Sequence, residues 1–406
     1  METEPVIVEL PRHLAHSLSS AFKDVSIEIK RPTAAASIPN LGLELSDLAW
    51  AHSDEASGDF RSDYVTKPTL PMLQAIAYSS LGDGDLGEDA TTASLCEYVA
   101  DLVGHEAAIL VVSGTMGNNV ALRSALKDPP HAILADSRSH MISLESGAAS
   151  SLFGAMIKNV VPSNGGHLTL ADVMKHSVLT ETRFDCPTRI ISLENPLGGT
   201  IMPLSDIRAI SQWTRAQSPP IHMHLDGSRI WEAAAAGGCT LREMGECFDS
   251  IQLCLSKGLG APIGSIVTGT AAFIRRADWA RKLLGGSIRA SGVIAAPARV
   301  AIDDVFLGGK LMAAQRKAMK ASNLWEELGG TLQMPTETNM VWLDLKASGL
   351  TLEGFQAEAA KVGLKVGMLS YERLVFHYQI TAAAFARLCD LFSRVLKKPE
   401  SKMMPV

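Results

Sequence analysis

Short apolar segments that alternate with helical patterns are the feature that most restricts the fold of this chain. From about residue 107 onward, the segments typical of strands are 107–112, 132–136, 189–194 and 221–226. A helix is predicted between the first two of them, from Met116 to Leu126. This alternation is typical of an α/β domain whose mostly parallel sheet is covered by helices. Because ligands bind beyond the carboxyl ends of parallel strands, we expect the functional residues just after these strands.

The chain is long enough for two domains, at 406 residues. Residues 1–58 mix charge, proline and small residues without a sustained period, which favours an N-terminal arm. A large domain is predicted over 59–305, and a long helical stretch over about 293–328 leads out of it. Residues 306–406 are then a smaller C-terminal α/β domain. Its predicted strands are 339–345 and 373–380.

Charge and cysteine content argue against several classes of function. The formal net charge is -6 with both signs dispersed, so no basic stripe suits a nucleic acid or a membrane surface. The six cysteines are scattered without a C-x-x-C pair, which indicates reduced thiols rather than disulfides or a metal site. The N-terminal residues lack a basic region followed by a long apolar run, and no segment reaches transmembrane length. We therefore expect a cytoplasmic protein that binds neither nucleic acid nor a membrane.

Lys257 lies where a predicted strand runs into a glycine-rich turn. The strand begins near Asp249, and Ile251, Leu253 and Leu255 share the parity of Lys257 along it. Partial burial on the apolar side of a strand lowers the pKa of a lysine toward the free amine, which forms a Schiff base with an aldehyde. This position predicts a lysine that binds pyridoxal 5'-phosphate. The alternative is a side chain that simply leaves the sheet into water.

Two other segments have features of a pyridoxal phosphate site. Ser113, Gly114 and Thr115 follow a predicted strand and open a helix, whose free N–H groups and positive end suit a phosphate. The alternative is that the hydroxyl residues only cap the helix. Asp226 ends a predicted strand, and a carboxylate there would keep a pyridine nitrogen protonated. Asp226 and Lys257 are 31 residues apart, one β-helix-β step, so adjacent parallel strands could carry both to the same edge.

In order and in content, these motifs resemble the threonine aldolase family of pyridoxal phosphate enzymes. The segments that carry the resemblance are Phe60-Arg-Ser-Asp-Tyr-Val-Thr-Lys-Pro-Thr, Leu86-Gly-Glu-Asp, Ser113-Gly-Thr-Met-Gly-Asn, His224-Leu-Asp-Gly-Ser-Arg-Ile, Leu255-Ser-Lys-Gly-Leu-Gly-Ala-Pro-Ile-Gly-Ser and Gly285-Gly-Ser-Ile-Arg. The resemblance runs from about Phe60 to near the C-terminus and does not cover residues 1–58. It implies the aspartate-aminotransferase-type fold of pyridoxal phosphate enzymes (fold type I).

The resemblance also implies roles for individual residues. Lys257 would be the Schiff-base lysine, Asp226 would face the pyridine nitrogen, and His140 would stack on the ring and take part in catalysis. The phosphate would be held by Gly114 and Thr115, while Lys282 and Arg289 match positions that reach the phosphate of a neighbouring subunit. The carboxylate of a small amino-acid substrate would be bound by Ser62, Arg229 and Arg373; Arg229 could instead hold the cofactor phenolate. The enzyme would then be a homo-oligomer, a dimer or a tetramer.

Two positions depart from the family pattern on the expected substrate side. Gly198 takes the place of a histidine associated with the β-hydroxyl of the substrate, and Leu86 stands where the family tends to have tyrosine. A site built for a hydroxyl supplies hydrogen bonds to it, so the loss of polar groups favours a substrate without a hydroxyl.

Two reactions remain open. The first, which these departures favour, is racemisation of L-alanine to D-alanine, because some fungal alanine racemases resemble threonine aldolases. Lys257 would remove the Cα proton, and His140, His377 or a water would return one to the other face. The second is cleavage of L-threonine or L-allo-threonine to glycine and acetaldehyde, with other groups or water in place of the missing histidine. A non-catalytic relative would be expected to have lost Lys257 or Asp226, and this chain keeps both.

Overall fold

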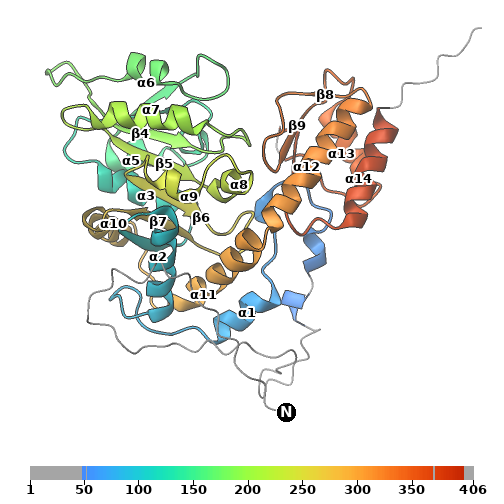
Figure 1. Ribbon diagram of the computed structural model, residues 1–406, viewed down its shortest axis with the longest axis horizontal. Helices are drawn as coiled ribbons and strands as arrows, with labels where there is room; N and C mark the ends of the chain where they lie inside the picture. Colours follow the sequence, from blue (N-terminus) through green and yellow to red (C-terminus); the bar gives the residue numbers. More distant parts are fainter. Residues whose placement is uncertain (1–47, 52, 369–370, 397–406) are drawn as a thin grey trace, which may run out of the picture. The chain divides into compact units, whose positions relative to one another are not determined.

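A seven-stranded, mostly parallel sheet is the larger of two sheets in the computed structural model, which describes residues 48–51, 53–368 and 371–396 (Figure 1). Its order is β1-β7-β6-β5-β4-β2-β3. The strands are β1 (Ala107–Val111), β2 (Ala132–Asp136), β3 (Met156–Val160), β4 (Thr188–Glu194), β5 (His222–Gly227), β6 (Ser250–Cys254) and β7 (Ser265–Gly269). From β3 through β6 neighbouring strands run parallel, whereas β7 is antiparallel to both β1 and β6. The predicted α/β architecture is confirmed.

Helices cover both faces of this sheet because its strands are apolar on both sides. In β1, Leu110 belongs to the main core with α2 and α7, whereas Ile109 and Val111 pack with α3 and α10. The helices up to α10 are α1 (Leu70–Ala77), α2 (Ala90–Val103), α3 (Gly114–Ala125), α4 (His140–Ser143), α5 (Ala148–Phe153), α6 (Leu170–His176), α7 (Leu204–Arg215), α8 (Ile230–Ala235), α9 (Leu241–Gly245) and α10 (Ala271–Leu283). Short 3-10 turns lie at Ala49–Ala51, Ser53–Ala56 and Asp63–Val65.

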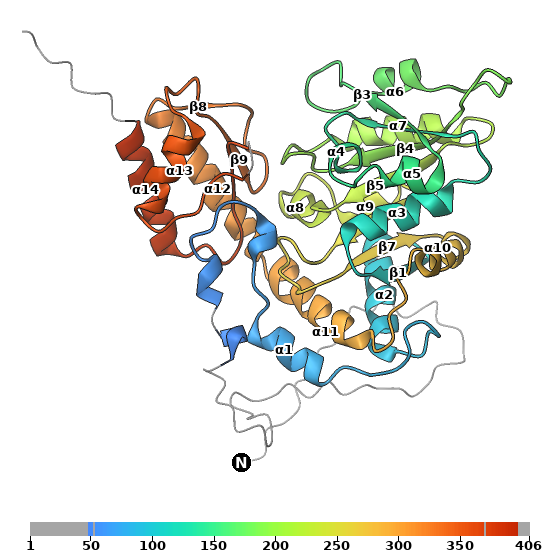
Figure 2. The ribbon, with the colours of Figure 1, turned by 180° about the vertical axis from the view of Figure 1, so that it is seen from behind.

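A smaller antiparallel sheet follows, with the order β10-β9-β8. Its strands are β8 (Thr331–Leu332), β9 (Met340–Asp344) and β10 (Arg373–Val375), and Figure 2 shows it beside α12, α13 and α14. The remaining helices are α11 (Gly292–Ala301), the π-helix η6 (Ile302–Leu307), α12 (Lys310–Glu327), α13 (Leu352–Ala360) and α14 (Ala382–Val395). The core between the smaller sheet and α12, α13 and α14 contains Trp325, Phe355 and Phe392, and also Phe60 from the N-terminal part of the chain.

The strand boundaries of the larger sheet match the predicted ones closely, and the later elements differ more. The strand predicted over 373–380 ends at Val375, and the helical stretch predicted over 293–328 is divided by η6. The proposed boundary between residues 305 and 306 falls inside η6 and stays a prediction. Of the predicted N-terminal arm, residues 1–47 lie outside the described part. Among the described helices, none has both the length and the apolar character needed to cross a membrane.

Candidate functional site

The carboxyl ends of β4, β5 and β6 bring together the residues expected at the reacting centre. Asp226, near the end of β5, pairs in register with Glu194 on β4 and with Gln252 on β6. The prediction that the strands leading to Asp226 and to Lys257 are adjacent and parallel is confirmed, because β5 and β6 are hydrogen-bonded parallel neighbours.

The surroundings of Lys257 differ from those predicted. β6 ends at Cys254, and all five of its residues are buried, so alternating parity does not distinguish its two faces. Lys257 lies three residues beyond the strand in a turn, where its carbonyl accepts hydrogen bonds from Gly260 N and from Thr66 Oγ1. The side chain is partly buried. The turn, rather than a strand face, therefore positions this lysine.

Asp226 is a buried carboxylate with several donors around it. Its Oδ1 accepts from Ser228 N at 3.0 Å, and its Oδ2 accepts from Asn118 Nδ2 at 2.8 Å. Burial alone would raise the pKa of Asp226, but the positive charge of Lys257 and these hydrogen bonds bring that pKa below its ordinary value. An ionised carboxylate in this place is suited to hold a protonated pyridine nitrogen.

His140 begins α4 and is held by contacts of both its backbone and its side chain. Its backbone N donates to Glu194 Oε2 at 2.9 Å, and its Nδ1 lies 2.9 Å from Glu145 Oε1. The hydrogen bond to Glu145 raises the pKa of His140. Glu145 is buried and also accepts from Asn118 Nδ2, which therefore bridges Glu145 and Asp226. Sequence analysis missed Glu145 and Asn118, since neither stands at the end of a strand.

Glu194, the last residue of β4, is another residue to which sequence analysis assigned no role. Burial and the neighbouring charge of Asp226 raise the pKa of Glu194 to about 7, against the lowering influence of the His140 hydrogen bond and of Lys257. The charge of Glu194 also affects the pKa of Arg229. A carboxyl group with a near-neutral pKa, amid these four site residues, is able to exchange protons at physiological pH.

The first turn of α3 faces the same region. Ser113 is its N-cap, and its Oγ accepts from Met116 N at 3.1 Å, so the capping alternative holds for that hydroxyl. The backbone N–H groups of Gly114 and Thr115 have no acceptor within the described residues. A Cβ on Gly117 would lie 2.6 Å from Gln252 Cγ, so glycine is what lets this helix approach β6. These features fit a phosphate at the helix N-terminus.

An unexpected carboxylate lies among the residues predicted to bind the substrate carboxylate. Asp63 is fully buried and accepts from Arg229 Nε at 2.8 Å and from Arg229 Nη2 at 2.7 Å. Burial would raise the pKa of Asp63, but the charge of Arg229 and its hydrogen bonds lower it to about 2, with Lys257 and Arg373 adding to the effect. Ser62 is buried next to this pair, and its Oγ lies 3.4 Å from Asp63 Oδ1. Two nitrogens of the Arg229 guanidinium, Nε and Nη2, therefore already donate to Asp63.

Arg373 is more available than Arg229. Its guanidinium carbon lies 5.6 Å from the centre of the Trp342 ring and 5.1 Å from that of Tyr371. Its Nε is buried, and within the described residues that atom has no hydrogen-bond partner. Burial and the charge of Arg229 lower the pKa of Arg373. A substrate carboxylate would satisfy this cation.

Gly198 is connected to Arg373 through Trp342. Trp342 Nε1 donates to the Gly198 carbonyl at 2.7 Å, and the same indole contacts the Arg373 guanidinium. Gly198 has a φ of +61°, a left-handed conformation that glycine adopts without the strain of a side chain. A Cβ at this position would lie 3.9 Å from Trp342 Cζ2, so the site has room for a larger residue and the conformation alone does not account for glycine there.

Leu86, Lys282 and Arg289 form a separate cluster. Lys282 Nζ binds Asp85 Oδ2 at 2.6 Å, Arg289 forms an ion pair with Asp83, and Leu86 is 69% exposed in the same loop. No hydrogen bond joins this cluster to Lys257 in the part of the chain that the structure describes. His377, another predicted proton donor, is buried with its Nε2 bonded to the Asp59 carbonyl, and burial lowers its pKa.

Comparison with known proteins identifies the family. The sequence model of the beta-eliminating lyase family matches residues 59–348. This chain belongs to that family. It is 49% identical to the aldolase vrtJ of Penicillium aethiopicum, over 86% of this chain and 88% of that protein. It is 38% identical to the alanine racemase TOXG of Cochliobolus carbonum (89% and 93% covered) and 40% identical to the low-specificity L-threonine aldolase of Eremothecium gossypii (82% and 86%).

Solved structures agree with the fold. The threonine aldolase of Leishmania major superposes with a TM-score of 0.72 at 18% identity, over 84% of this chain and 99% of that one. The resemblance to threonine aldolases and the fold of type I pyridoxal phosphate enzymes are therefore confirmed. The cofactor of this family is pyridoxal 5'-phosphate. The beta-eliminating lyase family member described here is accordingly a pyridoxal phosphate enzyme.

Proposed function

We propose that this enzyme cleaves a small β-hydroxy amino acid, L-threonine or L-allo-threonine, into glycine and acetaldehyde. The observation that carries the proposal is Glu194, a carboxyl group with a pKa of about 7 that pairs in register with Asp226 and accepts a hydrogen bond from His140 N. Aldol cleavage needs a base for the β-hydroxyl proton, and Glu194 supplies one where the histidine of the family pattern is absent. The relatives named as aldolases support this choice.

The residues around Lys257 fit the cofactor. Asp226 would face the ring nitrogen and Lys257 the aldehyde carbon. His140 would lie against the ring, and the N–H groups of Gly114 and Thr115 would hold the phosphate. When bound, pyridoxal phosphate supplies an electron sink for the pair left on Cα.

Different side chains of the protein would bind the substrate and transfer the protons. Arg373, with Ser62 and the remaining donors of Arg229, would hold the substrate carboxylate. The Glu194 carboxylate would take the proton of the β-hydroxyl as the Cα–Cβ bond breaks, so that the alkoxide oxygen becomes the carbonyl of acetaldehyde. Lys257 would deliver a proton to Cα, which completes glycine.

Racemisation of alanine is the second candidate. It is favoured by the absence of a polar side chain at Gly198 and by the 38% identical relative named alanine racemase. For this reaction Lys257 would remove the Cα proton, and His140 or Glu194 would return one to the opposite face.

A single pair of incubations separates these reactions. The purified holoenzyme receives L-threonine in one and L-alanine in deuterium oxide in the other, with chiral chromatography and mass spectrometry of the products. Acetaldehyde and glycine without deuterated D-alanine support the aldolase. Deuterated D-alanine without cleavage of threonine contradicts it and supports the racemase. Lys257→Ala is the control, which should abolish either product and the visible absorbance of the bound cofactor.

We also propose a homo-oligomer in the cytoplasm. Lys282 and Arg289 are 64% and 72% exposed in their side chains, and their ion pairs with Asp85 and Asp83 hold them at the surface. Placed there, they could reach the phosphate in a neighbouring subunit, as the family pattern implies. Sedimentation of the holoenzyme would distinguish a dimer or tetramer from a monomer.

A further inference from the structure

Asp226 is the end of a row of hydrogen-bonded side chains that runs back along the sheet. Asn118 Nδ2 lies 2.8 Å from Asp226 Oδ2, and Asn118 Oδ1 lies 3.2 Å from His224 Nε2. Ser250 Oγ then lies 2.9 Å from His224 Nδ1 and 2.8 Å from His222 Nε2. We call these five residues the β5 row. Asn118, His224 and Ser250 are almost completely buried, so water does not compete for their hydrogen bonds.

The direction of every hydrogen bond in the β5 row follows from the chemistry of its members. Asn118 lies between the carboxylates of Glu145 and Asp226, and only its NH2 group is able to donate to both. Its oxygen must therefore accept from His224, which places the proton of that ring on Nε2.

The same reasoning extends to the far end of the β5 row. Burial lowers the pKa of His224 and of His222, so both rings are neutral near pH 7. The bare Nδ1 of His224 must then accept from the hydroxyl of Ser250, and Ser250 must accept from Nε2–H of His222. All donors consequently point toward Asp226.

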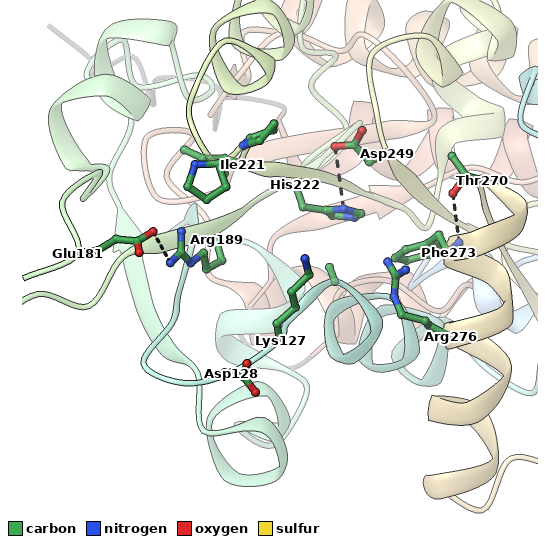
Figure 3. A pocket seen from close by; sticks show the side chains of 13 residues that line it. Lys127, Asp128, Glu181, Arg189, Ile221, His222, Asp249, Thr270, Phe273 and Arg276 are labelled. Carbon is green, nitrogen blue, oxygen red and sulfur yellow. Dashed lines mark hydrogen bonds and ion pairs between the residues drawn. The ribbon is translucent and has the colours of Figure 1, made fainter.

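His222 is the member nearest to solvent. It lines a cavity of about 650 Å³ at the opposite end of β5, with Lys127, Arg189 and Arg276 on the cavity wall (Figure 3). Its Nδ1 is 4.0 Å from Asp249 Oδ2, and its ring stacks on Phe273 with 5.3 Å between centres. These contacts fix the ring that starts the β5 row.

We propose that Asn118, His224, Ser250 and His222 are positioning residues for the cofactor ring, which act by presenting a row of aligned donors to Asp226. Aligned hydrogen bonds polarise one another, and a donor to a carboxylate stabilises its ionised form. The β5 row thereby keeps Asp226 in the state that pairs with a protonated ring nitrogen. This inference rests on the proposed placement of Asp226 at that nitrogen.

The first test reads the tautomers of the two histidines in the wild-type apoprotein and uses substitutions only to assign their signals. In 15N-histidine-labelled protein at pH 7, with signals assigned through His224→Asn and His222→Asn, both rings are expected as the Nε2–H tautomer. A His224 signal from the Nδ1–H tautomer or from a charged ring would overturn the proposal. That outcome is independent of the cofactor and of the reaction.

The second test compares two buried serines. Ser250→Ala breaks the β5 row, whereas Ser211→Ala removes a buried hydroxyl that donates to the Cys247 carbonyl outside the row. Affinity of the apoprotein for pyridoxal 5'-phosphate is measured by titration, together with the pH dependence of the bound cofactor's absorbance. Ser250→Ala is expected to weaken binding about 3- to 10-fold and to shift the pH dependence, and Asn118→Ala to weaken binding about 10- to 100-fold. Ser211→Ala should stay within about twofold of the wild type.

Asp226→Asn is the control for the proposed position of Asp226 at the ring nitrogen of the cofactor. If Asp226→Asn leaves the affinity and the absorbance unchanged, the proposed cofactor placement fails. If Asp226→Asn alters both while Ser250→Ala behaves like Ser211→Ala, the placement stands and the positioning role of the β5 row is refuted.

Discussion

Glu194 gives the most quantitative prediction, because its folded-state pKa is about 7 against an ordinary value of 4.5. Burial beside Asp226 penalises its ionised form, and a pKa difference of one unit corresponds to about 1.4 kcal/mol. The pKa of Glu194 is raised on folding, so its contribution to stability is fully present below about pH 4.5. It is lost as the pH rises through about 7.

Glu194→Gln removes this dependence, because glutamine stays neutral at every pH. The free energy of unfolding of the variant, relative to the wild type, should therefore rise between pH 5 and pH 8. The structure implies a rise of about 2 to 3 kcal/mol, since most of the shift from 4.5 to about 7 falls in this interval.

Urea unfolding of the two apoproteins at equal concentration, followed by tryptophan fluorescence at several pH values, measures this difference. Glu181→Gln is the matched control, because the Glu181 side chain is 52% exposed and pairs with Arg189 at the surface. A flat difference between Glu194→Gln and wild type, or one that falls with pH, would refute the claim that burial beside Asp226 raises the pKa of Glu194.

Two further predictions concern activity and the buried ion pair. If Glu194 takes the hydroxyl proton, kcat/KM for threonine should rise with pH through about 7. Glu194→Gln should lose this rise and reduce the rate by about 10²-fold or more, and a variant whose kcat/KM still rises through about pH 7 would exclude Glu194 as the base. Asp63→Asn leaves the Arg229 cation without its counter-ion, so we expect a loss of about 3 to 5 kcal/mol in the free energy of unfolding and a raised KM for threonine, measured by urea unfolding and initial rates. A change below about 1 kcal/mol would show that solvent reaches Arg229 easily.

Local patterns were enough to locate most strands and the start of α3. The strand that contains Asp226 near its end and the helix that starts after Ser113 follow from strand periodicity and helix capping, which depend on neighbouring residues. The assignment of Lys257 to a strand face was wrong, because β6 ends at Cys254 and a strand buried on both faces carries no parity signal.

The groups that sequence analysis missed depend on contacts between distant segments. Asp63 meets Arg229 across 166 residues, and Asn118 meets Asp226 across 108. A carboxylate in the 3-10 turn Asp63–Val65 resembles any surface residue in its local sequence, and only the fold shows that it is buried. The pKa of Glu194 likewise depends on β5, which lies beside it only in the folded chain.

The segment from Asp59 to Asp63 sets a limit on how this protein can be shortened. Phe60 packs in the core of the smaller sheet and exchanges backbone hydrogen bonds with Lys365 and Val375, while Asp63 neutralises Arg229 beside the larger one. A recombinant fragment that starts after this segment would lose an aromatic core residue and a buried counter-ion at once. An N-terminally shortened protein should therefore keep Asp59 and every residue after it, which is also where the match to the family begins.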